Sequence, residues 1–426
     1  MVISSQEIVG RLFLQLTVIV VACNIAGWIG RRFLLQSTVF MEMLAGFLLG
    51  PSFFGLFFPD LSQQVFPKAL TLAGIDSPVT HPNMHILYGL AQVGLVLYMF
   101  VVGTEVSHNE LLKQAKTSVR ISFAGILTPL AISFPLAYFL LHHSDLFVAN
   151  ISYVGAFLVV ACSFSVTAFP MLARMLSESG LSNTKLGTTV LSAAAIDDLL
   201  AWLLFPIAVS ASVASAGTAL NKILFVVGYV LLLSFVLNKY SRRINSVILS
   251  GFTPLVLVVL FLSAFTTDVL GISSVFGAFA CGAAFPRIPI LSEVTSRFKS
   301  VSLSIFLPCF FVYTGLNTKI TLVNTPLLAI FALVICIIAI LSKFLPCFLA
   351  SRSTGMSVKD SLVTGALMNS RGLMELILLN VFLDKSIISP TFYTIMVLMT
   401  IVTTSLASPV YNSLLPGKSD LERIII

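Results

Sequence analysis

The sequence predicts an all-α, polytopic membrane protein with about thirteen transmembrane helices. Of its 426 residues, 58% are hydrophobic and only 10% are charged, and the mean hydropathy is +1.04. Apolar runs long enough to cross a bilayer recur from one end of the chain to the other. No polar stretch is large enough for a separate soluble domain. We therefore expect a single membrane domain over residues 1–426, without a C-terminal regulatory domain.

The expected spans are separated by short polar or charged loops. The first run begins close to Met1 but lacks a small-residue cleavage site, so we expect it to be retained in the membrane. The ninth and tenth spans are short for a full crossing, and Pro308 interrupts the tenth. In chain order, the spans cover residues 8–30, 38–58, 86–106, 119–141, 151–177, 186–213, 218–238, 246–268, 271–286, 301–318, 326–350, 360–383 and 391–413.

The basic residues predict the orientation of the chain. If the N-terminus lies outside, 17 of the 24 Lys and Arg residues fall on the cytoplasmic side, five on the outer side and two within spans. Cytoplasmic loops carry such an excess, so we expect an outer N-terminus and a cytoplasmic C-terminus. The net charge of +7 then reflects loops rather than nucleic-acid binding. The six cysteines lie in apolar runs without metal-ligand spacing, and we expect no cofactor.

Two spans contain helix-breaking sequences at corresponding positions. The fifth contains SFSVTAFP at Ser163–Pro170, and the twelfth contains GALMNSRG at Gly365–Gly372. These interruptions are equivalent if two inverted six-helix repeats, about 8–213 and 246–413, are joined by a linker helix at about 218–238. Paired discontinuous helices in inverted repeats mark the substrate site of many secondary transporters. Two unrelated kinks are the alternative, since Pro and Gly are common in transmembrane helices.

Two adjacent carboxylates, Asp197 and Asp198, lie inside the apolar sixth span. A carboxylate near the bilayer centre costs several kcal/mol and rarely occurs there without a function. Neighbouring side chains on a helix point about 100° apart, so one can face a water-filled cavity while the other meets a partner. A purely structural role is disfavoured, because each charge needs its own compensation. The pair predicts a site that holds a small cation and exchanges it for a proton.

Three further charged residues lie within the later spans. Lys343 is in the middle of the eleventh span, and the two aspartates are its expected partners. The alternative is that its ammonium group extends to the membrane surface. Arg371 and Glu375 are four residues apart on the twelfth span and share a helix face. We expect a structural charge pair beside the broken helix, with direct contact to transported ions as the alternative.

The fifth span also offers oxygen ligands. Ser163, Ser165 and Thr167 supply hydroxyl groups, and an interrupted helix frees backbone carbonyls beside them. Oxygen ligands suit hard monovalent cations, so we expect Thr167 and Asp198 to contact the transported ion transiently. The alternative is that these small polar residues only mediate helix packing.

Several motifs in order resemble the monovalent cation:proton antiporter-2 family of sodium/hydrogen and potassium/hydrogen exchangers. The resemblance covers nearly the whole chain and implies a core domain with crossed broken helices and the ion site, and a second domain that forms a homodimer interface. It assigns ion binding to Asp198 and pairs Asp197 with Lys343. The motifs are Met41–Ser52 (MEMLAGFLLGPS), Phe100–Glu105 (FVVGTE), Ser165–Arg174 (SVTAFPMLAR), the Asp197–Asp198 pair, Gly277–Gly282 (GAFACG), Phe310–Leu316 (FFVYTGL) and Asn369–Leu376 (NSRGLMEL).

The expected function is secondary active antiport of protons against a monovalent cation, with Na⁺ as the leading candidate and K⁺ as the alternative. The two ions would compete for a buried aspartate while the site alternates between the two sides of a bacterial inner membrane. A gated cation channel is disfavoured because the charges are isolated rather than arranged in rings. A sodium-coupled solute symporter is another alternative. We expect no enzyme, since the sequence has no His/Glu metal cluster and no G-x-S-x-G motif.

Overall fold

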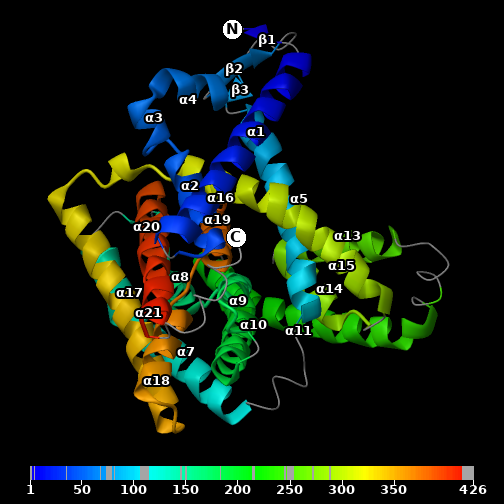
Figure 1. The fold of residues 1–426 in the computed structure, drawn as a ribbon, viewed down its shortest axis with the longest axis vertical. Coiled ribbons are helices and arrows are strands. Elements are labelled where there is room, and N and C mark those ends of the chain that lie inside the picture. Colours follow the sequence, from blue (N-terminus) through cyan, green and yellow to red (C-terminus); the bar gives the residue numbers. More distant parts are fainter. Residues whose placement is uncertain are drawn as a thin grey trace. The chain divides into compact units, whose positions relative to one another are not determined.

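The computed structural model describes most of the chain and is almost entirely helical (Figure 1). The described residues are 2–3, 5–34, 36–67, 69–72, 79–80, 82–105, 115–143, 146–148, 151–182, 184–213, 216–243, 246, 254–270, 273–286 and 289–414. The C-terminal tail from residue 415, with the predicted cytoplasmic Lys418 and Arg423, lies outside this part, as do most of the predicted loops at 106–114 and 244–253.

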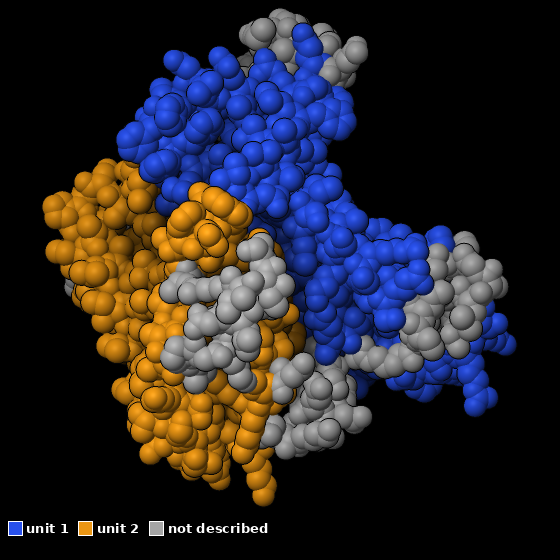
Figure 2. All heavy atoms as spheres, viewed as in Figure 1, with its two compact units in different colours: residues 1–26, 42–106, 225–319 blue, residues 27–41, 107–224, 320–426 orange. Residues whose placement is uncertain are grey.

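The chain divides into two units, each assembled from segments far apart in the sequence (Figure 2). Unit 1 contains residues 1–26, 42–106 and 225–319, and unit 2 contains residues 27–41, 107–224 and 320–426. Each unit therefore takes segments from both halves of the chain. The inverted relation between those halves stays a prediction.

Unit 1 is a helical assembly with a small sheet, in which β1 pairs with β2 in parallel and β2 with β3 antiparallel. The strands are β1 (Val2–Ile3), β2 (Ala69–Leu72) and β3 (Val79–Thr80). The helices with most of their residues in unit 1 are α1 (Ser5–Ile29), α2 (Thr38–Leu48), α3 (Phe54–Phe57), α4 (Pro59–Val65), α5 (Pro82–Glu105), α11 (Ala216–Lys239), α13 (Pro254–Val269), α14 (Ser274–Ala284), α15 (Pro289–Val301) and α16 (Leu307–Asn317).

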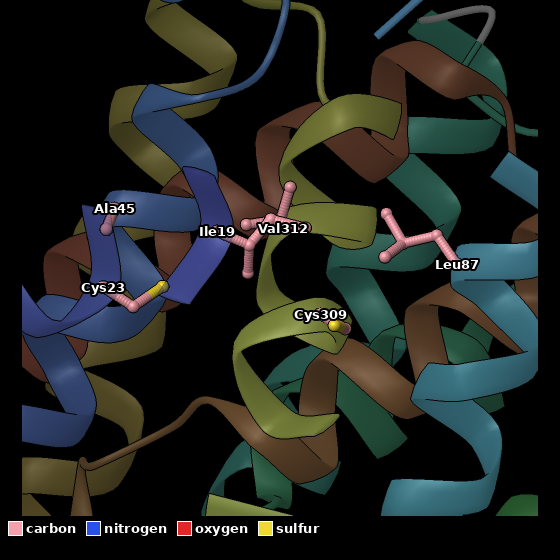
Figure 3. Close-up of a cluster of buried hydrophobic side chains, with 6 residues drawn as sticks. All are labelled: Ile19, Cys23, Ala45, Leu87, Cys309 and Val312. Carbon is pink, nitrogen blue, oxygen red and sulfur yellow. The ribbon is translucent and has the colours of Figure 1, made fainter. Parts of the chain in front are cut away.

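Small and aliphatic side chains hold these helices together. Figure 3 shows one buried cluster, in which α1, α2, α5 and α16 contribute Ile19, Cys23, Ala45, Leu87, Cys309 and Val312. The backbones of α2 and α16 approach closely at Gly46, where a Cβ atom would collide with the carbonyl group of Phe311. Small residues allow such close backbone packing between apolar helices.

Unit 2 contains the two predicted helix interruptions, the Asp197–Asp198 pair and Lys343. Its helix α10 packs against α7, α8 and α9, and α17 packs against α7, α18 and α20. The helices are α7 (Ala115–His143), α8 (Tyr153–Ser165), α9 (Phe169–Glu178), α10 (Lys185–Val213), α17 (Pro326–Ser353), α18 (Val358–Met368), α19 (Leu373–Asp384), α20 (Pro390–Ser405) and α21 (Ala407–Leu414).

Every predicted span contains an apolar helix among the described residues. Nine are long and apolar enough to cross a membrane, and four shorter ones lie at Thr38–Leu48, Gly228–Lys239, Pro254–Val269 and Ser274–Ala284. The count of thirteen crossings stays a prediction.

Two span boundaries differ from the sequence-based expectation. The span expected at 38–58 was too long, because α2 ends at Leu48 and the chain turns at Gly50–Ser52. The span expected at 301–318 was too short, because the apolar helix runs from Leu291 to Leu322. A π-helical turn at Ser302–Phe306 precedes Pro308. Pro308 has no backbone N–H to donate, and the π-helical turn accommodates this loss without ending the helix.

The two predicted helix interruptions are both present, and they contact one another. The chain leaves helical geometry at residues 166–168, between α8 and α9, and at residues 369–372, between α18 and α19. The backbone N–H of Ala168 donates to the carbonyl of Ser370 at 3.1 Å. Gly372 has a φ of +142°, a backbone conformation that residues with a Cβ atom rarely adopt. Unit 2 thus contains a pair of crossed discontinuous helices.

Candidate functional site

The predicted site residues gather in unit 2, where the crossed breaks face α10 and α17. Asp197 and Asp198 come from α10 and Lys343 from α17, and their exposed fractions are 1%, 1% and 0%. Thr167 and Arg371 lie in the two broken segments and are also fully buried. Two helices and two interruptions therefore place several ionisable groups in one buried region of the protein.

Asp197 is surrounded by donors. Lys343 Nζ lies 3.0 Å from Asp197 Oδ2, and the Ser122 hydroxyl on α7 donates to Oδ1. Thr167 Oγ1 lies 2.8 Å from Asp197 Oδ2 and 2.9 Å from the Met368 carbonyl oxygen. Since a hydroxyl carries one proton, Thr167 can donate at full strength to only one of these acceptors. The ion pair and the two hydroxyl groups stabilise the negatively charged form of the Asp197 carboxylate.

Asp198 has a different environment, although it is the next residue on the same helix. Among the described residues, neither of its carboxyl oxygens has a hydrogen-bond partner of normal geometry. The first turn of α9, which begins at Phe169, lies beside this carboxylate. A buried carboxylate without a hydrogen bond of normal geometry leaves a strong interaction unmade, so a proton or a cation at Asp198 would lower the free-energy cost of its burial.

The carbonyl groups at the end of α8 are bound by cationic side chains. Arg371 donates from Nη1 to the Ser163 carbonyl and from Nη2 to the Phe164 carbonyl, the latter at 2.9 Å. Lys343 Nζ donates to the carbonyl of Ser165. A helix C-terminus carries partial negative charge and unpaired carbonyls, both of which cations stabilise. The carbonyls predicted as free cation ligands are thus occupied by Arg371 and Lys343 in this structure.

The serine hydroxyls of α8 do not reach the aspartates. Ser165 Oγ donates to the carbonyl of Ala161 in the same helix at 2.7 Å. The Ser163 hydroxyl is buried and has no hydrogen-bond partner among the described residues. Of the three predicted hydroxyl ligands, only Thr167 therefore contacts the carboxylate pair, and it contacts Asp197 rather than Asp198.

Arg371 and Glu375 form the expected charge pair at the start of α19. Arg371 Nη1 lies 3.6 Å from Glu375 Oε2, and both side chains are fully buried. Glu375 is in the first turn of α19, where the helix N-terminus favours negative charge. Arg371 therefore links two helix ends, because the same guanidinium binds Glu375 and the last carbonyls of α8.

Sequence comparison identifies the family. A family model described as sodium/hydrogen exchanger, transmembrane, matches residues 17–415. The chain belongs to the sodium/hydrogen exchanger family. It is 34% identical over 419 residues to the Na⁺/H⁺ antiporter NhaS4 of Synechocystis sp., covering 95% of this chain and 98% of that protein. It is 26% identical over 406 residues to the Na⁺/H⁺-K⁺ antiporter GerN of Bacillus cereus, covering 93% and 94%.

Other relatives are longer proteins. The chain is 29% identical over 422 residues to K⁺/H⁺ antiporter 1 of Saccharomyces cerevisiae, covering 94% of this chain and 46% of that protein. It spans about half the length of this and several other curated relatives. Among solved structures, the sodium proton antiporter MjNhaP1 from Methanocaldococcus jannaschii has a similar fold, with a TM-score of 0.65 and 17% identity over 96% of this chain and 99% of that one.

These findings confirm the predicted family and the multi-pass helical membrane fold of this exchanger-family chain. The expected pairing of Asp197 with Lys343 is present in the structure, and the Lys343 side chain is fully buried. Thr167, which the sequence placed with Asp198, contacts Asp197 instead.

Sequence reasoning missed part of the site on α7. Ser122 was not selected, although it is a polar residue in the fourth span, whose predicted repeat equivalent contains Lys343. Gly125 was also missed, because an isolated glycine in an apolar span is not informative by itself. A Cβ atom at Gly125 would lie 2.8 Å from Cys347 Sγ and 3.7 Å from Lys343 Cε. Gly125 thus lets α7 approach the ion pair closely.

Proposed function

We propose that this protein is a secondary active antiporter that exchanges protons for a monovalent cation, with Na⁺ as the primary substrate. The observation that carries the proposal is the contrast between two adjacent buried aspartates. Asp197 has three donor groups, whereas Asp198 has no normal hydrogen bond within the described residues. This contrast supports a division of labour in which Asp197 organises the site and Asp198 receives the transported ion.

The proposed cycle uses competition at one carboxylate. When Asp198 is ionised, an entering cation neutralises it and replaces the missing donors. Access then changes to the opposite side of the membrane, where the cation leaves and a proton takes its place. Exchange is obligatory if the site cannot switch from one side of the membrane to the other while it is empty and negatively charged. The apparent KM for the cation should rise as the pH falls, because protonation removes the charge that the cation binds.

The choice of Na⁺ rests on the names of similar proteins rather than on the geometry. NhaS4 and GerN are both named as Na⁺/H⁺ antiporters, and both match nearly the whole of this chain. GerN is also named for K⁺, and the yeast relative is a K⁺/H⁺ antiporter. K⁺/H⁺ exchange is therefore the second candidate function, since a carboxylate and hydroxyls alone do not select ion size.

Flux into proteoliposomes tests the proposal directly. The purified chain is reconstituted with a trapped pH-sensitive dye, and each alkali cation is added in turn without any organic solute. Antiport predicts a saturable, cation-dependent change of internal pH, with Na⁺ giving the highest kcat/KM. A requirement for a solute would indicate symport. Non-saturating flux without proton movement would indicate a channel, and either result would contradict antiport.

Asp198→Asn provides the decisive variant. It retains the shape of the side chain but removes both the negative charge and the proton-binding site. We expect cation-dependent proton movement to fall to the level of empty liposomes, while size-exclusion behaviour stays that of the parent protein. As a matched control, Asp360→Asn on α18 removes a carboxylate outside the buried site and should leave transport unchanged. Normal exchange by folded Asp198→Asn protein would exclude Asp198 as the carrier.

The assembly and placement of the protein complete the proposal. We propose a homodimer, in agreement with the sequence resemblance, and tests by light scattering in detergent would detect it. We also propose a bacterial inner membrane location with the N-terminus outside, supported by the distribution of Lys and Arg.

A further inference from the structure

Unit 1 has an exposed apolar surface that the transport mechanism does not use. It consists of Phe53, Leu56, Phe57, Phe58 and Leu61, whose exposed fractions are 46%, 60%, 62%, 53% and 51%. These side chains, here named the Phe53–Leu61 surface, lie on α3, α4 and the residues beside them. Figure 1 shows both helices near the end of unit 1 from which α1 starts. Such a dense group of exposed large apolar side chains marks an interaction site.

The Phe53–Leu61 surface is fixed at both ends. Before it, Ser52 Oγ donates to the carbonyl of Thr318 at 2.7 Å. After it, Gln15 Nε2 donates to the carbonyl of Val65 at 2.6 Å. Between these points, the rings of Phe53 and Phe57 pack with centroids 4.9 Å apart. The aromatic rings are therefore held outward by a defined local structure.

The attachment points set the depth of this surface. Gln15 belongs to the apolar helix Glu7–Leu34, and Thr318 lies near the end of the apolar helix Leu291–Leu322. The preceding helix α2 has 11 residues and is only about 16 Å long, roughly half of the ~30 Å hydrocarbon core. The chain thus turns into α3 and α4 beside the N-terminal third of one membrane helix and near the end of another, rather than continuing as a straight span.

We propose that the Phe53–Leu61 surface inserts into the boundary between lipid headgroups and acyl chains and anchors unit 1 in one leaflet. Lipid is favoured as the occupant because the adjoining part of α1 also exposes apolar side chains, with Phe13 at 64% and Leu14 at 48%. The segment also exposes the polar residues Asp60, Gln63 and Gln64. A short segment that combines exposed aromatic and aliphatic residues with polar ones is typical of interfacial membrane binding.

Spin labelling of the full-length protein in liposomes tests this proposal. A single nitroxide is attached through Phe57→Cys in a cysteine-free background, and its collisions with oxygen and with a water-soluble nickel chelate are measured. The matched control is Gln63→Cys, an exposed polar position on α4. A second apolar position, Leu56→Cys, guards against a local effect of replacing one ring. Transport activity of each labelled protein verifies its fold.

Lipid insertion predicts that the nitroxides at 56 and 57 collide more with oxygen than with the chelate, and that the nitroxide at 63 shows the opposite preference. Equal chelate access at 57 and 63 would place the surface in water and overturn the proposal. Dipolar broadening at 57 that disappears when unlabelled protein is mixed in would show that a second copy covers the surface. That result would also overturn the lipid assignment.

Discussion

Asp197 and Asp198 show how one helix position changes the chemistry of a carboxylate. Asp197 meets Lys343, Ser122 and Thr167, while the Asp198 oxygens meet no normal donor among the described residues. Breaking a buried ion pair strands a charge, so the environment of Asp197 is costly to alter. Asp198 has no such network to lose, so the proposed exchange of a cation for a proton at this carboxylate would break no hydrogen bond of normal geometry seen in the described residues.

The Lys343–Asp197 pair can be tested by a double-mutant cycle. Lys343→Ala leaves an uncompensated buried carboxylate, so we expect unfolding to become easier by roughly 3–5 kcal/mol and the melting temperature to fall. Asp197→Asn combined with Lys343→Ala should recover part of this loss, because both charges are removed together. Loss of the charge pair should also change the dependence of transport on membrane potential. Thermal denaturation in detergent and flux at defined potentials are the measurements.

The control for this cycle is Lys359→Ala, an exposed lysine on α18 whose loss should change neither property. If the loss in the double variant equals the sum of the single losses, the two residues are not coupled. The contact between them would then contribute nothing to stability. The pair could also no longer explain how transport depends on membrane potential.

Ser122 is the residue that sequence reasoning missed, and it gives a second prediction. Ser122→Ala removes the donor to Asp197 Oδ1 without changing any charge. A hydrogen bond to a charged group contributes about 1.5–3 kcal/mol, so stability should fall by that order and transport should weaken. Ser122→Thr keeps the hydroxyl and should restore part of both. Ser133→Ala is the control, since Ser133 is a buried serine on the same helix that donates only to its own helix at Pro129.

At the scale of elements, the crossed breaks concentrate helix-end charges inside the protein. The C-terminus of α8 meets Arg371 and Lys343, and the N-terminus of α19 contains Glu375 in its first turn. Opposite charges at helix ends are stabilising, and the effect grows where water is excluded. The side chains therefore stabilise two interrupted helices that would otherwise leave unpaired backbone groups in the membrane.

Arg371 carries the prediction at this scale. Arg371→Lys keeps a positive charge but replaces the two Nη groups of the guanidinium by one ammonium nitrogen. That single nitrogen cannot take the positions from which Nη1 and Nη2 contact Glu375 and the carbonyls of Ser163 and Phe164. A buried carbonyl left unpaired costs about 1–3 kcal/mol, so we expect a lower melting temperature and a lower kcat/KM for the cation. The control is Arg352→Lys at the exposed end of α17. Unchanged stability and transport in Arg371→Lys would contradict the role assigned to the guanidinium.

The breaks themselves were predictable, but their contacts were not. Pro170 and Gly372 mark places where a helix cannot continue, and this follows from local backbone chemistry. The use of the Ser163, Phe164 and Ser165 carbonyls depends on side chains more than 170 residues away in the sequence. No local pattern reveals such a pairing, so the sequence suggested free cation ligands where the structure has bound ones.

At the scale of the whole molecule, each unit combines distant segments of the chain. Hydropathy located thirteen apolar helices because the membrane requires apolar stretches of a minimum length. It gave poor boundaries where a span turns or extends, as at Leu48 and Leu291, because turns and π-helical segments leave the average hydropathy unchanged. The division into units was likewise not readable from composition, since each unit is assembled from separate segments of the chain.

The orientation of the chain is the last prediction, and labelling in cells tests it. The six native cysteines are buried, and all are replaced before a single cysteine is introduced at Gln63 or at Arg242, both exposed positions in unit 1. Five predicted spans separate these positions, so they should lie on opposite sides of the membrane. The positive-inside rule places Arg242 in the cytoplasm. An impermeant maleimide should therefore label position 63 in intact cells and position 242 only after permeabilisation.

Two results of this labelling would contradict different parts of the argument. Labelling of position 242 alone from outside would reverse the orientation and leave the span count intact. Labelling of both positions from the same side would require an even number of crossings between them, and one of the five predicted spans would then not cross. In that case α11 or the broken helix α8–α9 would be the element to re-examine. Of the four shorter apolar helices in the described chain, only Gly228–Lys239 in α11 lies between the two labelled positions.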